Sequence, residues 1–207
     1  MSTRTRSIIT PDWAGRTVEE DQSGWPVIQR FEPVERNFQV GLTDLSHRPK
    51  AIVQGPSVKD MGNLKPGQAL WTGHAFFACL KQDEGVIFDL TGPMNPTWPD
   101  TYHTDITEGW VLLGLFGPRS PEVMQRLVAV DIERPDYNEP FYLVTNAHGM
   151  AVRVLNTKGA EPGFLLSCNR SQGQNFFDNC IHTGRHLGLK PVGFELFQTW
   201  FRNLTGH

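Results

Sequence analysis

The same local plan occurs twice in this chain of 207 residues, and it limits the folds that the chain can adopt. In residues 51–62 and again in residues 111–127, an apolar run meets a Gly-Pro pair, and a serine and a helix start follow. Proline cannot donate to a sheet ladder and glycine tolerates a positive φ, so a Gly-Pro pair ends a strand. Two such units favour an α+β fold with two related halves, at about residues 40–100 and 105–195.

The second unit begins a better helix than the first. Ser120 offers a capping oxygen and Pro121 fits the first turn, which predicts a helix over 121–129. Strands are expected at 141–146, 150–155 and 164–168, and further helices at 175–187 and 194–204. The last helix carries four large aromatic residues within eleven positions, so we expect it to be buried on two sides.

The bulk composition excludes several classes of protein. A net charge of −3 gives no basic surface for nucleic acid. An apolar run of about 18 residues would be needed for a membrane helix, and neither that nor a signal-peptide core occurs. Three cysteines without paired spacing are typical of a reducing cytoplasm, where they act as small buried apolar residues. We therefore expect a cytoplasmic protein.

Residues 1–37 differ from the remainder, which we treat as one domain over residues 38–207. This stretch is charged, contains three prolines and shows no sustained period, so we expect an extended N-terminal arm. Its aromatic residues Trp13, Trp25 and Phe31 would be poorly placed in a free tail. We expect them to lie on a surface, either of this chain or of a partner.

Five segments follow one another in the order found in a known family. They are VGLTDLSHRPKAIVQGP at 40–56, a strand-turn-strand at 64–90, the second Gly-Pro unit at 105–127, TKGAEPGFL at 157–165 and GLKPVG at 188–193. Together they resemble the folate-binding aminomethyltransferase family, to which the T protein of the glycine cleavage system belongs. The resemblance implies two related halves of antiparallel sheet with packed helices, as in the folate-binding domain of that family.

The resemblance also implies a tetrahydrofolate site. Asp89 matches a carboxylate that the family keeps near the reactive nitrogens of the pterin, where it would be catalytic. Glu161 matches a residue that binds the aminopyrimidine edge, and Phe164 is kept in the same motif, so both are predicted to bind the cofactor. The alternative is that Asp89 is an ordinary acid at a strand end and Glu161 a solvent-exposed turn residue.

Several positions depart from the family pattern. Phe88 replaces the first acid of a pair, Lys158 replaces an aromatic residue and Leu165 replaces an acid. An arginine that follows GLKP-G in relatives has no counterpart, and the family's C-terminal domains are absent from this sequence. These differences imply that the chain would share a folate site with a partner, bind folate weakly, or not bind it.

A chain of this kind resembles the gamma subunit of heterotetrameric sarcosine oxidase. We therefore expect a folate-domain-like subunit of a complex that oxidatively demethylates a methylated amine, with larger catalytic subunits as partners. The aromatic arm and last helix predict a partner interface above about 2,000 Å². The alternatives are a stand-alone tetrahydrofolate-dependent transferase and a non-enzymatic folate-binding regulator. Whether the chain is itself catalytic stays open.

No flavin, haem or metal is expected in this chain. It has no dinucleotide fingerprint, phosphate loop or serine elbow. His182 and His186 have the spacing of two ligands on one helix face, but surface or packing roles are the more common reading of such a pair.

Overall fold

Two large antiparallel sheets form the body of the protein. The computed structural model describes residues 9, 15–21, 24–32, 38–91, 100–132 and 139–205. The six-stranded sheet has the order β10–β11–β12–β9–β3–β13, and its strands are β3 (Val40–Asp44), β9 (Trp110–Phe116), β10 (Phe141–Ala147), β11 (Met150–Asn156), β12 (Gly163–Asn169) and β13 (Leu189–Pro191). The five-stranded sheet has the order β5–β6–β7–β4–β8, with β4 (Lys50–Gln54), β5 (Ala69–Trp71), β6 (Ala75–Lys81), β7 (Glu84–Asp89) and β8 (Tyr102–Asp105). Both sheets are antiparallel except where β13 runs parallel to β3, which confirms the predicted fold class.

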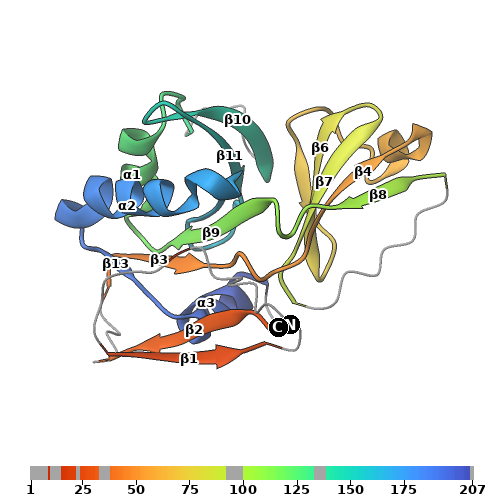
Figure 1. Ribbon diagram of the computed structural model, residues 1–207. Helices are drawn as coiled ribbons and strands as arrows, with labels where there is room; N and C mark the ends of the chain where they lie inside the picture. The colour runs from red at the N-terminus through yellow and green to blue at the C-terminus, as the bar shows by residue number, and fades with distance from the viewer. Residues whose placement is uncertain are drawn as a thin grey trace.

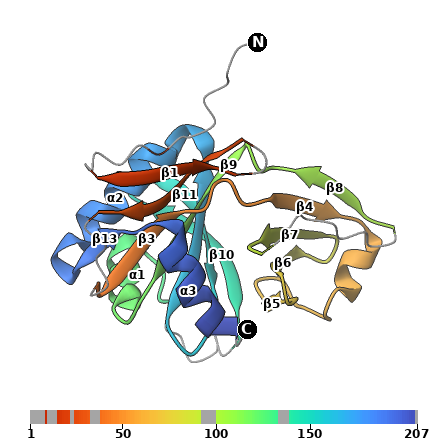
Figure 2. The ribbon, with the colours of Figure 1, turned by 90° about the horizontal axis from the view of Figure 1, so that it is seen from below.

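Helices cover both faces of the six-stranded sheet (Figure 1). The helices are α1 (Ser120–Leu127), α2 (Gly173–Gly184) and α3 (Phe194–Thr205), and three 3-10 turns are η1 (Pro56–Asp60), η2 (Arg170–Gln172) and η3 (Arg185–Leu187). The first two helices share an apolar core with one face of the sheet. The opposite face packs on α3 and on the five-stranded sheet, which lie side by side in Figure 2.

The two Gly-Pro units have the same geometry at the strand end and differ afterwards. Gly55 and Gly117 both have positive φ angles, 146° and 112°, which other residues rarely adopt. In the first half η1 follows, and in the second half α1 follows. The halves are interleaved, because β3 precedes the first Gly-Pro pair yet lies in the six-stranded sheet between β9 and β13.

The N-terminal stretch contains a two-stranded hairpin of β1 (Arg16–Glu20) and β2 (Pro26–Phe31). The hairpin lies beside α3, and Arg30 forms an exposed ion pair of 2.9 Å with Glu195 of that helix. Trp25 is buried and Phe31 half-buried, whereas Trp13 lies outside the described residues. The described part of the expected arm therefore packs on the chain's own surface, and the domain boundary after residue 37 stays a prediction.

The aromatic face of α3 fills the space between the two sheets. Phe197 and Trp200 are 1% and 6% exposed, and both pack against Phe116 of β9. Phe201 contacts Trp71 of the five-stranded sheet. The prediction that this helix is buried on two sides is confirmed. Because this chain buries those aromatics itself, their number was the wrong reason to expect a large partner interface.

Two further sequence observations have a structural outcome. All three cysteines are buried free thiols, at positions 79, 168 and 180, as expected. Among the helices in the described part of the chain, none is both long and apolar enough to cross a membrane.

Candidate functional site

The segment between β3 and β4 carries the chain from one sheet to the other, and the first motif of the resemblance lies there. Asp44 accepts a hydrogen bond from the Ser46 backbone N–H at 2.9 Å, which tightens the turn after β3. The Ser46 hydroxyl accepts a hydrogen bond from the Leu112 N–H of β9 at 3.2 Å. The His47 ring meets the Phe194 ring edge-on, 4.8 Å between centroids. Each polar residue of the motif therefore fixes the crossing between sheets.

Burial controls the protonation of two groups in this crossing. The pKa of His47 is lowered to about 3, first by burial and then by the charges of Arg48 and Lys50. His47 is therefore neutral at physiological pH. The pKa of Asp44 is raised by burial, against the opposing effects of its bond with Ser46 and the charge of Lys50.

Lys50, at the start of β4, is a lysine with no exposed surface. Its ammonium Nζ donates to the backbone carbonyls of Ser46 and Arg48, each at 2.8 Å. Burial lowers its pKa to about 7, while the nearby carboxylates of Asp44 and Asp105 oppose that shift. The Lys50 side chain therefore links two backbone carbonyls of the crossing segment, and its ammonium can lose its proton near neutral pH.

Asp89, the predicted catalytic carboxylate, lies at the end of β7 and is fully buried. One carboxylate oxygen, Oδ1, accepts the backbone N–H of Thr91 at 3.1 Å and lies 3.6 Å from Nη2 of Arg48. The Arg48 Nε donates to the Asp89 carbonyl at 3.2 Å. Arg48 therefore balances the charge of this carboxylate and ties β7 to the crossing between the sheets.

Glu161 lies in the turn between β11 and β12, and its side chain is exposed. This turn packs against α3, since a Cβ on Gly159 would overlap Leu204 and one on Gly163 would overlap Trp200. Glycine at both positions permits that close approach. The turn therefore packs closely on α3, and the Glu161 carboxylate lies on the solvent-exposed side of the turn.

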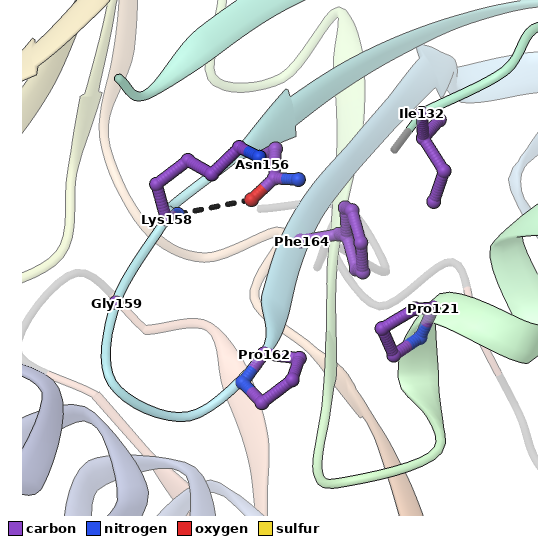
Figure 3. A pocket seen from close by; sticks show the side chains of 7 residues that line it. All are labelled: Pro121, Ile132, Asn156, Lys158, Gly159, Pro162 and Phe164. Atoms are coloured by element: carbon purple, nitrogen blue, oxygen red, sulfur yellow. Dashed lines mark hydrogen bonds between the residues drawn. The ribbon is translucent and has the colours of Figure 1, made fainter. Parts of the chain in front are cut away.

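Phe164 is the second residue of β12 and is buried, and it lines a pocket of about 170 Å³ (Figure 3). The other residues that line this pocket are Pro121, Ile132, Asn156, Lys158, Gly159 and Pro162. The Asn156 side-chain oxygen accepts the backbone N–H of Lys158 at 2.9 Å, which holds Lys158 in a left-handed conformation. Neither Asp89 nor Glu161 lines the pocket.

The three predicted site residues are not gathered into one enclosed site. Asp89 ends a strand of the five-stranded sheet, whereas Glu161 and Phe164 belong to the six-stranded sheet. The pocket beside Phe164 is smaller than the ~300–1,000 Å³ typical of ligand sites. A carboxylate at Glu161 suits the paired donors of a pterin edge.

The two histidines with ligand-like spacing are both exposed, His182 on α2 and His186 on η3. Within residues 9, 15–21, 24–32, 38–91, 100–132 and 139–205, no group of three His, Cys, Asp or Glu side chains is placed to hold a metal ion.

Sequence reasoning missed Arg48 and Lys50, although both lie inside the first motif. Their signal is position: a lysine that begins the apolar run KAIV must either project from the strand end or be buried with partners. The sequence alone does not decide between these, because the partners are backbone carbonyls two and four residues away.

Comparison with known proteins supports the same family as the motifs. Residues 89–200 match the family model described as GCVT N-terminal domain. The aminomethyltransferase of Bacillus velezensis is 24% identical over 89% of this chain and 59% of its own length. That of Desulforamulus reducens is 24% identical over 82% of this chain and 55% of its own. The chain thus spans less than two thirds of these relatives.

Two solved structures have a similar fold. The glycine cleavage system aminomethyltransferase T from Bartonella henselae has a TM-score of 0.64 at 16% identity, covering 88% of this chain and 57% of that one. A chain of the heterotetrameric sarcosine oxidase from Corynebacterium sp. U-96 has a TM-score of 0.59 at 12% identity, covering 74% of this chain and 88% of that one.

Proposed function

Because this chain belongs to the GCVT N-terminal domain family, the folate-binding domain of aminomethyltransferases, we propose that it serves as a folate-domain-like subunit of a larger enzyme. That enzyme would oxidatively demethylate a methylated amine, as a sarcosine oxidase or an amine monooxygenase does. The chain would contribute to tetrahydrofolate binding, to one-carbon transfer or to assembly. Larger catalytic subunits would be its partners, and a cytoplasmic location stays a prediction.

The observation that carries this proposal is the extent of the two structural matches. The match to the sarcosine oxidase chain covers 88% of that chain, whereas the match to aminomethyltransferase T covers 57% of that protein. The sarcosine oxidase chain thus consists almost entirely of the fold that it shares with this chain, which favours a similar role as a subunit.

Within such a complex, the three predicted residues would have separate tasks. Tetrahydrofolate, when bound, accepts a one-carbon unit on its nitrogens. Glu161 would accept hydrogen bonds from the aminopyrimidine edge, and its exposed position leaves it accessible to a ligand held against a partner. Phe164 would form the apolar base of the neighbouring turn. Asp89, held by Arg48, would supply negative charge from the end of β7.

A second candidate is a tetrahydrofolate-dependent aminomethyl or methyl transferase that works without an oxidase. The names of the relatives favour it, since both are aminomethyltransferases. The loss of the first acid of the pair, at Phe88, and of the arginine after 188–193 favours the subunit instead.

Purification of the tagged full chain from its native host separates the two. The subunit proposal expects larger chains to copurify in fixed ratio, together with amine-dependent formaldehyde production or its capture on tetrahydrofolate. A monodisperse, cooperatively folded monomer that transfers a one-carbon unit to tetrahydrofolate unaided would overturn it in favour of the transferase. A monomer that neither assembles nor binds folate would overturn both.

A further inference from the structure

Arg153 lies on the face of β11 that points toward the five-stranded sheet, and among the described residues no carboxylate forms an ion pair with it. Its guanidinium carbon lies 3.6 Å from the centre of the Trp110 ring, a stacked cation–π contact. Its Nη1 atom is buried and has no hydrogen-bond partner in the described part of the protein. By contrast, Arg30, Arg48 and Arg119 each pair with an acid. A buried, unmatched guanidinium N–H is costly and calls for an acceptor.

Two hydroxyl groups beside Arg153 also lack a hydrogen-bond partner among the described residues. Ser167 is 1% exposed and Tyr142 is 5% exposed, and the hydroxyl oxygen of each is buried without a hydrogen-bond partner among the described residues. Burial raises the pKa of Tyr142 to about 12, so its phenol keeps its proton and remains a donor. Serine can turn its O–H toward any acceptor within reach.

Strand register places these groups together. Arg153 and Ser167 are direct cross-strand neighbours on β11 and β12, at the separation where side chains interact. Val144 of β10 is opposite Arg153, so Tyr142, two residues earlier, is diagonal to it on the same face. The charge of Arg153 opposes the rise in the pKa of Tyr142, in agreement with this placement, and the charge of Glu84 adds to that rise. Leu112 of β9 is opposite Ser167, so Trp110, two residues earlier on β9, is diagonal to Ser167 on the same face.

Three buried groups that can donate, one guanidinium and two hydroxyls, therefore occupy neighbouring positions on three adjacent strands, and the set includes a positive charge. Ordered water can satisfy one or two such donors, but water does not neutralise a half-buried guanidinium. A negatively charged acceptor satisfies the hydrogen bonds and the charge at once.

We propose that Arg153, Ser167 and Tyr142 form a binding site for one small monoanion, a halide or a carboxylate group, between the two sheets. The site includes neither Asp89 nor Glu161 nor any residue that lines the pocket beside Phe164, and it does not depend on the proposed function. The anion would join the donors of β10, β11 and β12 and thereby stabilise the inner layer of the protein.

A crystal of the full chain, in whichever assembly it purifies, grown in bromide tests the site directly. The expected result is anomalous bromide density in hydrogen-bond contact with Arg153 and Ser167. A matched crystal grown in formate identifies the carboxylate form, because a planar density on the same donors replaces the bromide. Only ordered water at the site in both crystals would overturn the proposal.

Thermal unfolding gives an independent readout in solution. At constant ionic strength, replacing sulfate by bromide or formate should raise the melting temperature of the wild type relative to that of Arg153→Gln, in a saturable way. Ser167→Ala, which removes one neutral donor, should weaken the apparent affinity about tenfold, and Tyr142→Phe should do the same. Arg153→Gln should abolish the effect.

The matched control is Arg170→Gln. Arg170 also lies over a tryptophan, Trp25, but its Nη1 already donates to the Glu108 carbonyl at 3.2 Å. This variant should keep the full anion response. A response that is linear in concentration, or equal in Arg153→Gln and Arg170→Gln, would contradict a specific site.

Discussion

Asp89 and Glu161 are the two carboxylates that the family resemblance singles out, and the fold places them in opposite environments. Asp89 is fully buried and lies 3.6 Å from a guanidinium, whereas Glu161 stands exposed on a turn. A buried charged pair affects folding as soon as one member is removed, while an exposed acid is free to serve recognition. The same motif-level evidence therefore leads to different physical consequences at the two positions.

The largest expected effect is on Asp89. Asp89→Ala should lower the free energy of unfolding by about 3–5 kcal/mol, because Arg48 would be left buried without its carboxylate. Urea unfolding of wild type and variant measures this loss. A double-mutant cycle with Arg48→Met is the control, since the two losses should not add. A loss below about 1 kcal/mol would show that the pair does not hold β7 to the crossing between sheets.

The second prediction concerns the pH dependence of the free energy of unfolding, which we expect from Lys50 in the buried crossing and not from the exposed turn. The folded-state pKa of Lys50 is about 7, below its ordinary value of 10.5. Between these two pH values Lys50 is protonated in the unfolded chain and has lost its proton in the folded one. Stability should therefore rise with pH from about 7 toward 10.5, by about 1.4 kcal/mol per pH unit from this group. Chemical unfolding at a series of pH values checks the slope.

Lys50→Met is the matched variant for that slope, because it keeps a similar volume without a titrating group. It should remove the pH dependence in this window. An unchanged slope in Lys50→Met would assign the dependence to other groups and contradict the burial of a neutral lysine.

The smallest expected effect is on Glu161. Glu161→Ala should change the free energy of unfolding by no more than about 0.5 kcal/mol, since the side chain is exposed. The melting temperature of the variant against wild type tests this. A loss comparable to that of Asp89→Ala would mean that Glu161 is a structural residue of the turn and would remove the contrast between the two acids.

Much of the fold is predictable from the sequence because its signals are local. Gly117 and Pro118 end a strand, and α1 begins one residue before the predicted start. The predicted cap was wrong, because Ser120 lies inside the helix and donates its hydroxyl to the Pro162 carbonyl at 3.3 Å. The strands at 141–147, 150–156 and 163–169 follow from apolar runs separated by turn residues. These features depend on neighbours within a few positions, so they can be predicted without knowledge of the tertiary structure.

The remainder depends on contacts between distant segments. The placement of β3 in the six-stranded sheet needs β9 and β13, far along the chain. The strands of the hairpin at 16–31 pair locally, but the helix α3 on which the hairpin packs is distant in sequence. The aromatic content of α3 was visible, but the segments that cover it, β9 and β5, were not. Arg153 likewise looks like an ordinary strand residue until the register sets it beside Ser167 and over Trp110.

The most direct test of the proposed folate-domain function is calorimetry with tetrahydrofolate on the purified complex, comparing wild type with Glu161→Ala. This variant suits the test because its stability should be unchanged. The proposal predicts that binding weakens by roughly 2–4 kcal/mol, since the donors of the pterin edge would lose their carboxylate. Tight binding that Glu161→Ala leaves undisturbed would contradict it, and would place the folate site in another subunit with this chain as a structural copy of the domain.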